Sequence, residues 1–225
     1  METWKRTVYI SLLCVFCTSF GVSQLAPILP LYFHDLGVKT PEAMSLWSGL
    51  ATGATYLIVC LAAPFWGRVA DKKGRKITLI RSSFGMALCN ILIAFQTTPE
   101  GVVLIRLVQG LVSGFYSASI TLIASESPIE RTGWALGLLA SANLAGSLIG
   151  PLLGGYIADT VGIRNDFIIV GALMGLAGVL ATIFIHENYV PQPNPEKLSL
   201  RKLKEQIPEF NSIVALCVAS FIYAI

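Results

Sequence analysis

Six long apolar runs, separated by short polar stretches, dominate the pattern of residues along the chain. They cover residues 7–33, 46–66, 77–95, 102–124, 134–158 and 167–185. Each is close to the length of about 20 residues that a helix needs to cross a hydrocarbon layer about 30 Å thick. Because a bilayer offers no water to backbone groups, such runs must be helical. The pattern therefore predicts an all-α membrane protein with six transmembrane helices.

The chain changes character after the sixth run. Residues 188–211 are polar and basic, and we expect them to form a cytoplasmic linker. Residues 212–225 are apolar again but, at about 1.5 Å per residue, fall well short of a bilayer crossing. We therefore expect a six-helix bundle over residues 1–187, then the linker, then the truncated start of a seventh transmembrane helix.

Composition supports the membrane interpretation. Hydrophobic residues make up 54% of the chain and charged residues 13%, and the mean hydropathy is +0.69. These values exclude a water-soluble globular protein. The net charge of +3 comes from basic residues that lie in loops rather than in a groove, so we expect no nucleic-acid partner. No spaced set of His, Asp and Glu offers metal ligands or acid–base pairs, so we expect neither an enzyme nor a cofactor.

The distribution of positive charge predicts the orientation in the membrane. Of the 16 Lys and Arg residues, all but Lys39, Arg106 and Arg164 lie on one side of the six predicted helices. Basic loops stay on the cytoplasmic side. We therefore expect a multi-pass protein of the cell (inner) membrane with a cytoplasmic N-terminus.

A charged ten-residue stretch joins the second and third runs, and part of it recurs later. Residues 67–76 should form a tight cytoplasmic turn that their glycines allow. Its pattern G-x-[VI]-A-D-x-x-G returns 88 residues later, where Gly67, Asp71 and Gly74 correspond to Gly155, Asp159 and Gly162. Three runs separate the copies, which indicates a 3+3 inverted repeat. Chance recurrence of a short loop pattern is the alternative.

Glycine and proline mark two of the runs. In the fifth run, Gly146, Gly150 and Gly154 follow one another at four-residue spacing, which gives one smooth helix face that another backbone can approach. We expect Pro151 to break the hydrogen-bond ladder of this helix.

The second half of the first run carries Gly21, Pro27 and Pro30. Helix-weakening residues are tolerated in a membrane where neighbouring helices or a cavity satisfy the freed backbone groups. We therefore expect this half of the first helix to line a cavity.

Arg106 is the ionisable residue that lies well inside a predicted span. Placing an arginine there costs about 2.5–3.5 kcal/mol on insertion scales, which suggests a function. The alternative is an arginine satisfied structurally, by carbonyls or by a polar neighbour such as Gln24. The spans contain no carboxylate by this assignment, and Asp35 at a span end is the best candidate for a titrating acid.

These features together resemble the major facilitator superfamily, and within it the twelve-span drug:proton antiporters. Residues 67–76 resemble the loop signature of the superfamily, and Arg106, Gln109 and Gly110 its fourth-span motif R-x-x-Q-G. The fifth-span motif G-x-x-x-G-P-x-x-G-G is matched by Gly146, Gly150, Pro151, Gly154 and Gly155. The first-span motif of the antiporters is matched by Gly21, Pro27 and Pro30.

The resemblance implies a secondary transporter that exports drugs or small amphipathic solutes and is driven by the proton gradient. It implies that Arg106 lines the central cavity and influences proton coupling, with Gln109 fixing its geometry. The loop motif of Gly67, Asp71, Gly74, Arg75 and Lys76 would control the cytoplasmic gate.

The same resemblance implies that Arg75 pairs with an acid at the end of the fourth span, for which Glu126 is the candidate. It also implies a second six-helix half, which this chain lacks. Two other functions stay open, namely an uptake carrier of the same fold and a truncated protein that does not transport.

Overall fold

The computed structural model describes residues 3–187. The predicted linker and the predicted start of a seventh helix lie outside the described residues. Over the described range the helices are α1 (Thr3–Ser23), α2 (Leu25–Asp35), α3 (Pro41–Lys73), α4 (Arg75–Ala94), α5 (Pro99–Val112), α6 (Phe115–Glu126), α7 (Ile129–Val161) and α8 (Ile163–Phe184).

Six segments of residues 3–187 are long and apolar enough to cross a membrane. They are Trp4–Ser23, Pro41–Lys73, Arg75–Ala94, Pro99–Glu126, Ile129–Val161 and Ile163–Phe184. The prediction of six transmembrane helices in an all-α protein is thereby confirmed, and each segment overlaps one of the apolar runs.

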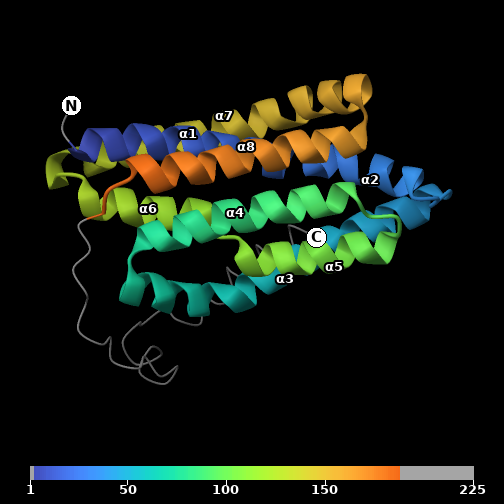
Figure 1. The fold of residues 1–225 in the computed structure, drawn as a ribbon, viewed down its shortest axis with the longest axis horizontal. Coiled ribbons are helices and arrows are strands. Elements are labelled where there is room, and N and C mark those ends of the chain that lie inside the picture. Colours follow the sequence, from blue (N-terminus) through green and yellow to red (C-terminus); the bar gives the residue numbers. More distant parts are fainter. Residues whose placement is uncertain (1–2, 188–225) are drawn as a thin grey trace, which may run out of the picture. The chain divides into compact units, whose positions relative to one another are not determined.

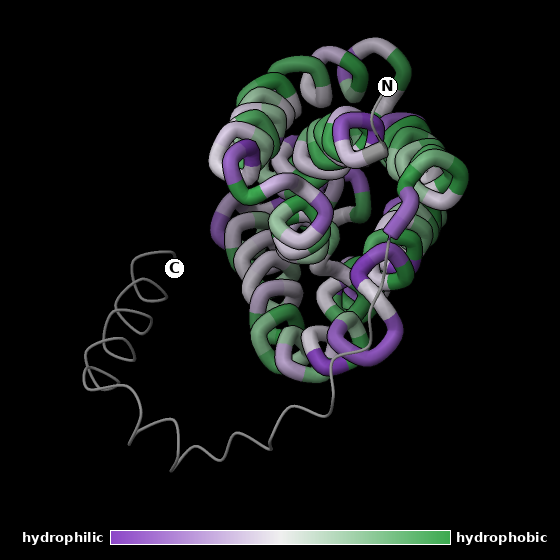
Figure 2. The backbone as a smooth tube through the Cα atoms, turned by 90° about the vertical axis from the view of Figure 1, so that its left-hand side faces the viewer, coloured by the Kyte–Doolittle hydropathy of each residue, from purple (hydrophilic) through white to green (hydrophobic). Residues whose placement is uncertain are grey.

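The helices of this bundle lie side by side and alternate in direction along its long axis (Figure 1). The main packing pairs are α1 with α7, α4 with α8, and α3 with α5. The turns after α2, α4 and α7 gather at one end, on the right of Figure 1, and the turns after α3 and α6 gather at the other. Figure 2 looks onto this second end and shows hydrophilic turns above largely hydrophobic helices.

Local sequence sets where two of the helices begin. The Thr40 hydroxyl accepts the backbone N–H of Ala43 at 3.3 Å, and Pro41 follows at the first helical position of α3. At the start of α5, Thr98 accepts from Gly101 at 3.2 Å and is likewise followed by a proline. A hydroxyl cap followed by proline satisfies one orphan N–H and removes another, so both helix starts are fixed by their sequence.

The junctions α3–α4 and α7–α8 share one geometry. Both α3 and α7 contain 33 residues, and each ends at a glycine with positive φ. Gly74 has φ 91° and ψ 159°, Gly162 has φ 89° and ψ 150°, and their N–H groups donate to the carbonyls of Ala70 and Ala158. Only glycine adopts such angles readily. The equivalent turns match the repeat seen in the sequence and are consistent with two copies of a three-helix unit.

The charged stretch 67–76 is helical over most of its length, so the prediction of a ten-residue turn was wrong. Helix α3 continues to Lys73, α4 begins at Arg75, and Gly74 alone makes the turn. Gly67 lies inside α3 with open space where a Cβ would be, so it is not required for the turn.

Pro151 lacks the N–H of one ladder hydrogen bond, as expected, and α7 continues through it. One further expectation about helix breaks was wrong. The fourth run, predicted as one helix, breaks at Ser113 and Gly114 into α5 and α6, and Gly114 takes φ 111°. A glycine with positive φ is a common helix stop, but an apolar run gives no sign of it.

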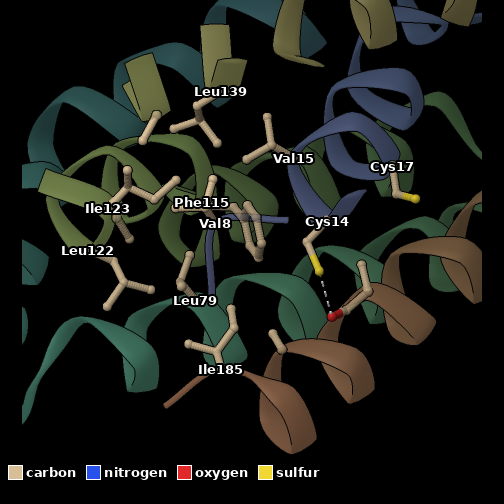
Figure 3. Close-up of a cluster of buried hydrophobic side chains, with 14 residues drawn as sticks. Val8, Cys14, Val15, Cys17, Leu79, Phe115, Leu122, Ile123, Leu139 and Ile185 are labelled. Atoms are coloured by element: carbon tan, nitrogen blue, oxygen red, sulfur yellow. Dashed lines mark hydrogen bonds between the residues drawn. The ribbon is translucent and has the colours of Figure 1, made fainter. Parts of the chain in front are cut away.

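One cluster of buried apolar side chains holds α1 against α4, α6, α7 and α8 (Figure 3). In it the Cys14 thiol donates to the carbonyl of Ala177 at 3.3 Å. Cys14 and Cys17 are free thiols, as are Cys60 and Cys89. Cys14, Cys17 and Cys89 are buried and pack as small apolar side chains, whereas Cys60 is exposed.

Candidate functional site

Arg106 and Gln109 form a buried pair on α5. A spacing of three residues places both on one helix face. Their exposed fractions are 6% and 3%, and the Arg106 guanidinium donates through Nη1 to Oε1 of Gln109 at 2.7 Å. The family resemblance implied this contact, in which Gln109 holds the Arg106 guanidinium.

Helix α3 closes over this pair. The Thr55 hydroxyl donates to the backbone carbonyl of Arg106 at 3.1 Å. A Cβ added at Gly110 would lie 2.5 Å from the Thr55 carbonyl oxygen, so a larger residue there would push α3 away. Gly110 therefore permits the close approach of α3 that buries Arg106.

A cavity of about 330 Å³ lies between α3, α4, α5 and α6. Gly110 lines it, together with Asp71 and Arg75 of the loop motif and polar side chains of α4 and α6. Arg106 is not among the lining residues. The loop motif and Gly110 of the fourth-span motif thus line the same cavity, and the buried Arg106 and Gln109 do not line it.

Arg81 and Trp66 satisfy the broken end of α5. The guanidinium stacks over the Trp66 ring, 3.5 Å from its centroid, and donates through Nη2 to the Ser113 carbonyl at 3.0 Å. The Trp66 indole N–H donates to the Leu111 carbonyl at 2.7 Å. The last carbonyls of a helix lack partners within the helix, and here Arg81 and Trp66 donate hydrogen bonds to two such carbonyls. Arg81 therefore stabilises the break between α5 and α6.

The turn at Gly74 is held from the end of the last described helix. The carboxylate of Glu187 accepts the backbone N–H groups of Arg75 and Lys76, each at 2.8 Å. Glu187 therefore caps the N-terminus of α4, where an anion is favoured. Asp71 lines the cavity nearby. The pairing of the Arg75 side chain with Glu126 stays a prediction.

The glycine face of α7 packs on α1, as the four-residue spacing predicted. An added Cβ at Gly146 would lie 2.6 Å from the Phe16 carbonyl oxygen, and one at Gly150 would lie 2.6 Å from that of Phe20. At Gly154 it would collide with the Gln24 side chain. Gly155 faces open space. This contact between α1 and α7, called the α1–α7 seam below, thus lies within the bundle of residues 3–187.

The first span breaks at Gln24, next to the residues marked from the sequence. Helix α1 ends at Ser23 and α2 starts at Leu25, with Pro27 in its first turn and Pro30 in its interior. Gly21 allows contact with α8, since a Cβ there would meet the Val170 side chain at 2.5 Å.

Asp166 is a buried acid that the sequence analysis missed. It has no exposed surface, and its Oδ2 accepts a hydrogen bond from Nε2 of Gln24 at 3.0 Å. The predicted sixth span starts at residue 167 and leaves Asp166 in the loop before it, whereas α8 begins at Ile163. The 88-residue repeat contains the missing signal: because α4 starts directly after Gly74, the matching helix starts directly after Gly162. Asp35, the acid preferred from sequence, is exposed beside His34.

The comparisons with known proteins agree on the family. The family model described as Major Facilitator Superfamily matches residues 11–225. Multidrug resistance protein MdtG of Proteus mirabilis (strain HI4320) is 36% identical over 221 residues, which is 98% of this chain and 55% of that protein. The MdtG protein of Salmonella dublin is 37% identical over 219 residues, or 97% of this chain and 54% of that protein. The chain therefore spans about half the length of the curated relatives it matches.

Two solved structures share the fold. The crystal structure of the human organic anion transporter MFSD10 (TETRAN) superposes with a TM-score of 0.72 at 18% identity, covering 91% of this chain and 53% of that chain. The POT family transporter PepTSo gives 0.71 at 17% identity, covering 84% and 40%. With the family model matched over nearly the whole sequence, the chain belongs to the major facilitator superfamily.

Proposed function

We propose that this chain is the N-terminal half of a secondary transporter that exports drugs or small amphipathic solutes by alternating access, driven by the proton gradient. It moves its substrate without altering it chemically and uses no cofactor. The observation that carries the proposal is the buried Arg106–Gln109 pair on α5, the helix whose Gly110 lines a cavity together with residues of the loop motif. The similarity to MdtG multidrug resistance proteins supports drugs as the substrate class.

The second half would cover the faces of α3 and α7. The buried share of the apolar window is 11% in α3 and 17% in α7, against 39–56% in the other four spans. In folds of this kind the binding cavity lies between two bundles, one of which rocks against the other. We therefore propose a C-terminal six-helix bundle as the partner of this surface, with the lipid bilayer around the remaining helices.

We propose the inner membrane as the location, with the N-terminus in the cytoplasm. The turns after α3 and α6 lie at the same end of the bundle as the start of α1 (Figure 1). This end carries the basic stretch 67–76, and basic turns are retained on the cytoplasmic side. The end with Lys39 and Arg164 would face outward.

Substitution of Arg106 tests the proposed transport function. In the complete protein, reconstituted in liposomes, Arg106→Lys keeps the charge but loses the planar set of donors that reaches Gln109. A buried charged hydrogen bond contributes about 1.5–3 kcal/mol, so we expect efflux of a fluorescent drug to fall by about tenfold to a hundredfold. Arg106→Ala should abolish it. Uptake by the wild-type protein in the same assay would identify an importer instead.

Arg131 supplies the control, because it is an exposed arginine in the first turn of α7. Arg131→Ala should leave both insertion and efflux unchanged. Near-normal efflux by Arg106→Ala, at a normal level of inserted protein, would contradict the proposal and give Arg106 a structural role.

A further inference from the structure

Asp166 and Gln24 form an isolated buried pair with an unusual deficit of donors. Both side chains are fully buried, and one hydrogen bond of 3.0 Å joins Gln24 Nε2 to Asp166 Oδ2. The remaining oxygens, Oδ1 of Asp166 and Oε1 of Gln24, are both buried without a hydrogen-bond partner. An ionised carboxylate and an amide oxygen are acceptors only, so neither can satisfy the other.

The cations of the surrounding elements are engaged elsewhere. Arg164, two residues before Asp166, is exposed and donates to the Gln96 carbonyl at 3.3 Å. Arg106 on α5 donates to Gln109. On the helices that pack against α8, the basic side chains lie in the first two turns, at the opposite end of the bundle. They are Lys5 and Arg6 on α1, Arg75, Lys76 and Arg81 on α4, and Arg131 on α7.

The other titratable groups around Asp166 do not neutralise it. On α7, Asp159 is exposed and carries the same sign of charge. On α2, the Tyr32 hydroxyl donates to the Ile93 carbonyl at 2.7 Å, and Asp35 is exposed. On α4, Cys89 is a buried thiol. The first turn of α8 favours an anion through the helix dipole, but Gln24 is the hydrogen-bond partner that the carboxyl has.

One proton resolves the whole arrangement. Placed on Oδ1, it removes a buried charge that no cation compensates. It also makes Oδ1 a donor, for which Oε1 of Gln24 is an unsatisfied acceptor, while Nε2 of Gln24 continues to donate to Oδ2. A neutral carboxylic acid and a primary amide can form a closed ring of two hydrogen bonds in which each oxygen has a partner.

We propose that Asp166 is a proton-binding site that carries the coupling proton of this half of the transporter. The coupling role rests on the proposed function. Gln24 lies at the break between α1 and α2, and its side chain is confined by α7, since a Cβ at Gly154 would lie 2.6 Å from the Gln24 Cβ. Movement at this break withdraws the amide and admits water, and the Asp166 carboxylic acid then passes its proton to water and becomes a carboxylate.

Infrared difference spectroscopy of the complete protein in nanodiscs tests proton binding directly. A protonated carboxyl shows a C=O stretching band that shifts in D2O and disappears when the proton is removed at high pH. We expect this band in the wild type and its loss in Asp166→Asn. The asparagine can form the same two hydrogen bonds with Gln24, so this variant should fold normally.

Two further variants keep the infrared result decisive. Glu100→Gln removes an exposed acid from the first turn of α5, at the same end of the bundle, and should leave the band unchanged. Gln24→Leu removes the amide partner and should shift the band towards that of a carboxylic acid without hydrogen bonds. An identical set of bands in wild type and Asp166→Asn would overturn the proposal, as would a band that Gln24→Leu does not move.

A transport measurement separates proton binding from coupling. Asp166→Asn is locked in the neutral form, so it should still exchange labelled substrate across liposomes at equal pH but lose accumulation driven by a pH gradient. Retained gradient-driven accumulation would overturn the coupling role. If the wild type itself shows no dependence on the gradient, the proposed function fails, while the infrared band still decides whether Asp166 holds a proton.

Discussion

Gly74 and Glu187 show how single residues fix the turn between α3 and α4. Gly74 takes φ 91°, and a Cβ there would lie 2.7 Å from Oε2 of Glu187, so both the backbone angle and the space require glycine. The Glu187 carboxylate accepts two N–H groups at the start of α4. The end of the sixth span is therefore tied directly to the turn between the second and third spans.

Removal of this cap should destabilise the bundle. Substitution of a helix-capping side chain by alanine costs about 0.5–2 kcal/mol, so we expect Glu187→Ala to lower the free energy of unfolding by about that amount. Gly74→Ala should cost at least as much, because it adds backbone strain to displacement of the carboxylate. Thermal unfolding in detergent measures both. Glu130→Gln, which changes an exposed acid in the first turn of α7, serves as the control.

The two capping variants should also fail to add. Gly74→Ala already displaces the carboxylate, so the double variant should lose less stability than the two single losses combined. Wild-type stability in Glu187→Ala would show that the cap contributes nothing to the fold.

For single residues, contacts within one helix could be predicted from the sequence better than contacts between residues far apart along the chain. The contact between Arg106 and Gln109 was implied by the family resemblance, and their spacing of three residues places both on one helix face. Asp166 and Gln24 are separated by 142 residues, and Glu187 and Arg75 by 112. No local pattern encodes such contacts, since they arise only when the helices pack.

At the element scale, helix α7 carries two kinds of glycine. Gly150 lies against α1, with the Phe20 carbonyl oxygen 2.6 Å from the position of an added Cβ. Gly137 lies on the same helix with nothing within 4 Å of that position. The four-residue spacing in the sequence singled out the first kind, and the contact with α1 gives the physical reason.

The two glycines should respond to alanine with opposite signs. Gly150→Ala overpacks the seam and should lower the free energy of unfolding by about 1–3 kcal/mol. Gly137→Ala adds a better helix former in open space and should raise it by up to about 1 kcal/mol. Unfolding in detergent, followed by circular dichroism, measures both shifts. Equal effects of the same sign would show that the α1–α7 seam is not close-packed at Gly150.

Helix boundaries were the part of the elements least accessible from the sequence. Apolar runs located every span because hydrocarbon length is a strong constraint. They did not locate the helical extension of α3 to Lys73, where charged residues continue a helix beyond the apolar part. They also did not locate the break at Gly114. There the carbonyls of Ser113 and Leu111 accept hydrogen bonds from Arg81 and Trp66 of other helices.

At the scale of the whole molecule, the bundle has two poorly covered helices on a family fold that its relatives build at nearly twice this length. The polar residues that line the cavity lie on α3, α4 and α6 and at the break between α5 and α6. Under the proposed function, residues 1–225 supply half of a transport pathway and need a second bundle to move substrate.

Proton-dependent dye efflux from liposomes shows whether residues 1–225 need a second bundle. One preparation holds the complete protein with both halves, and the other holds purified residues 1–225 at the same molar amount, with insertion verified in each. We expect gradient-driven efflux from the complete protein and none above empty liposomes from residues 1–225, since alternating access requires two bundles. Sustained, gradient-dependent efflux by residues 1–225 alone would contradict the account.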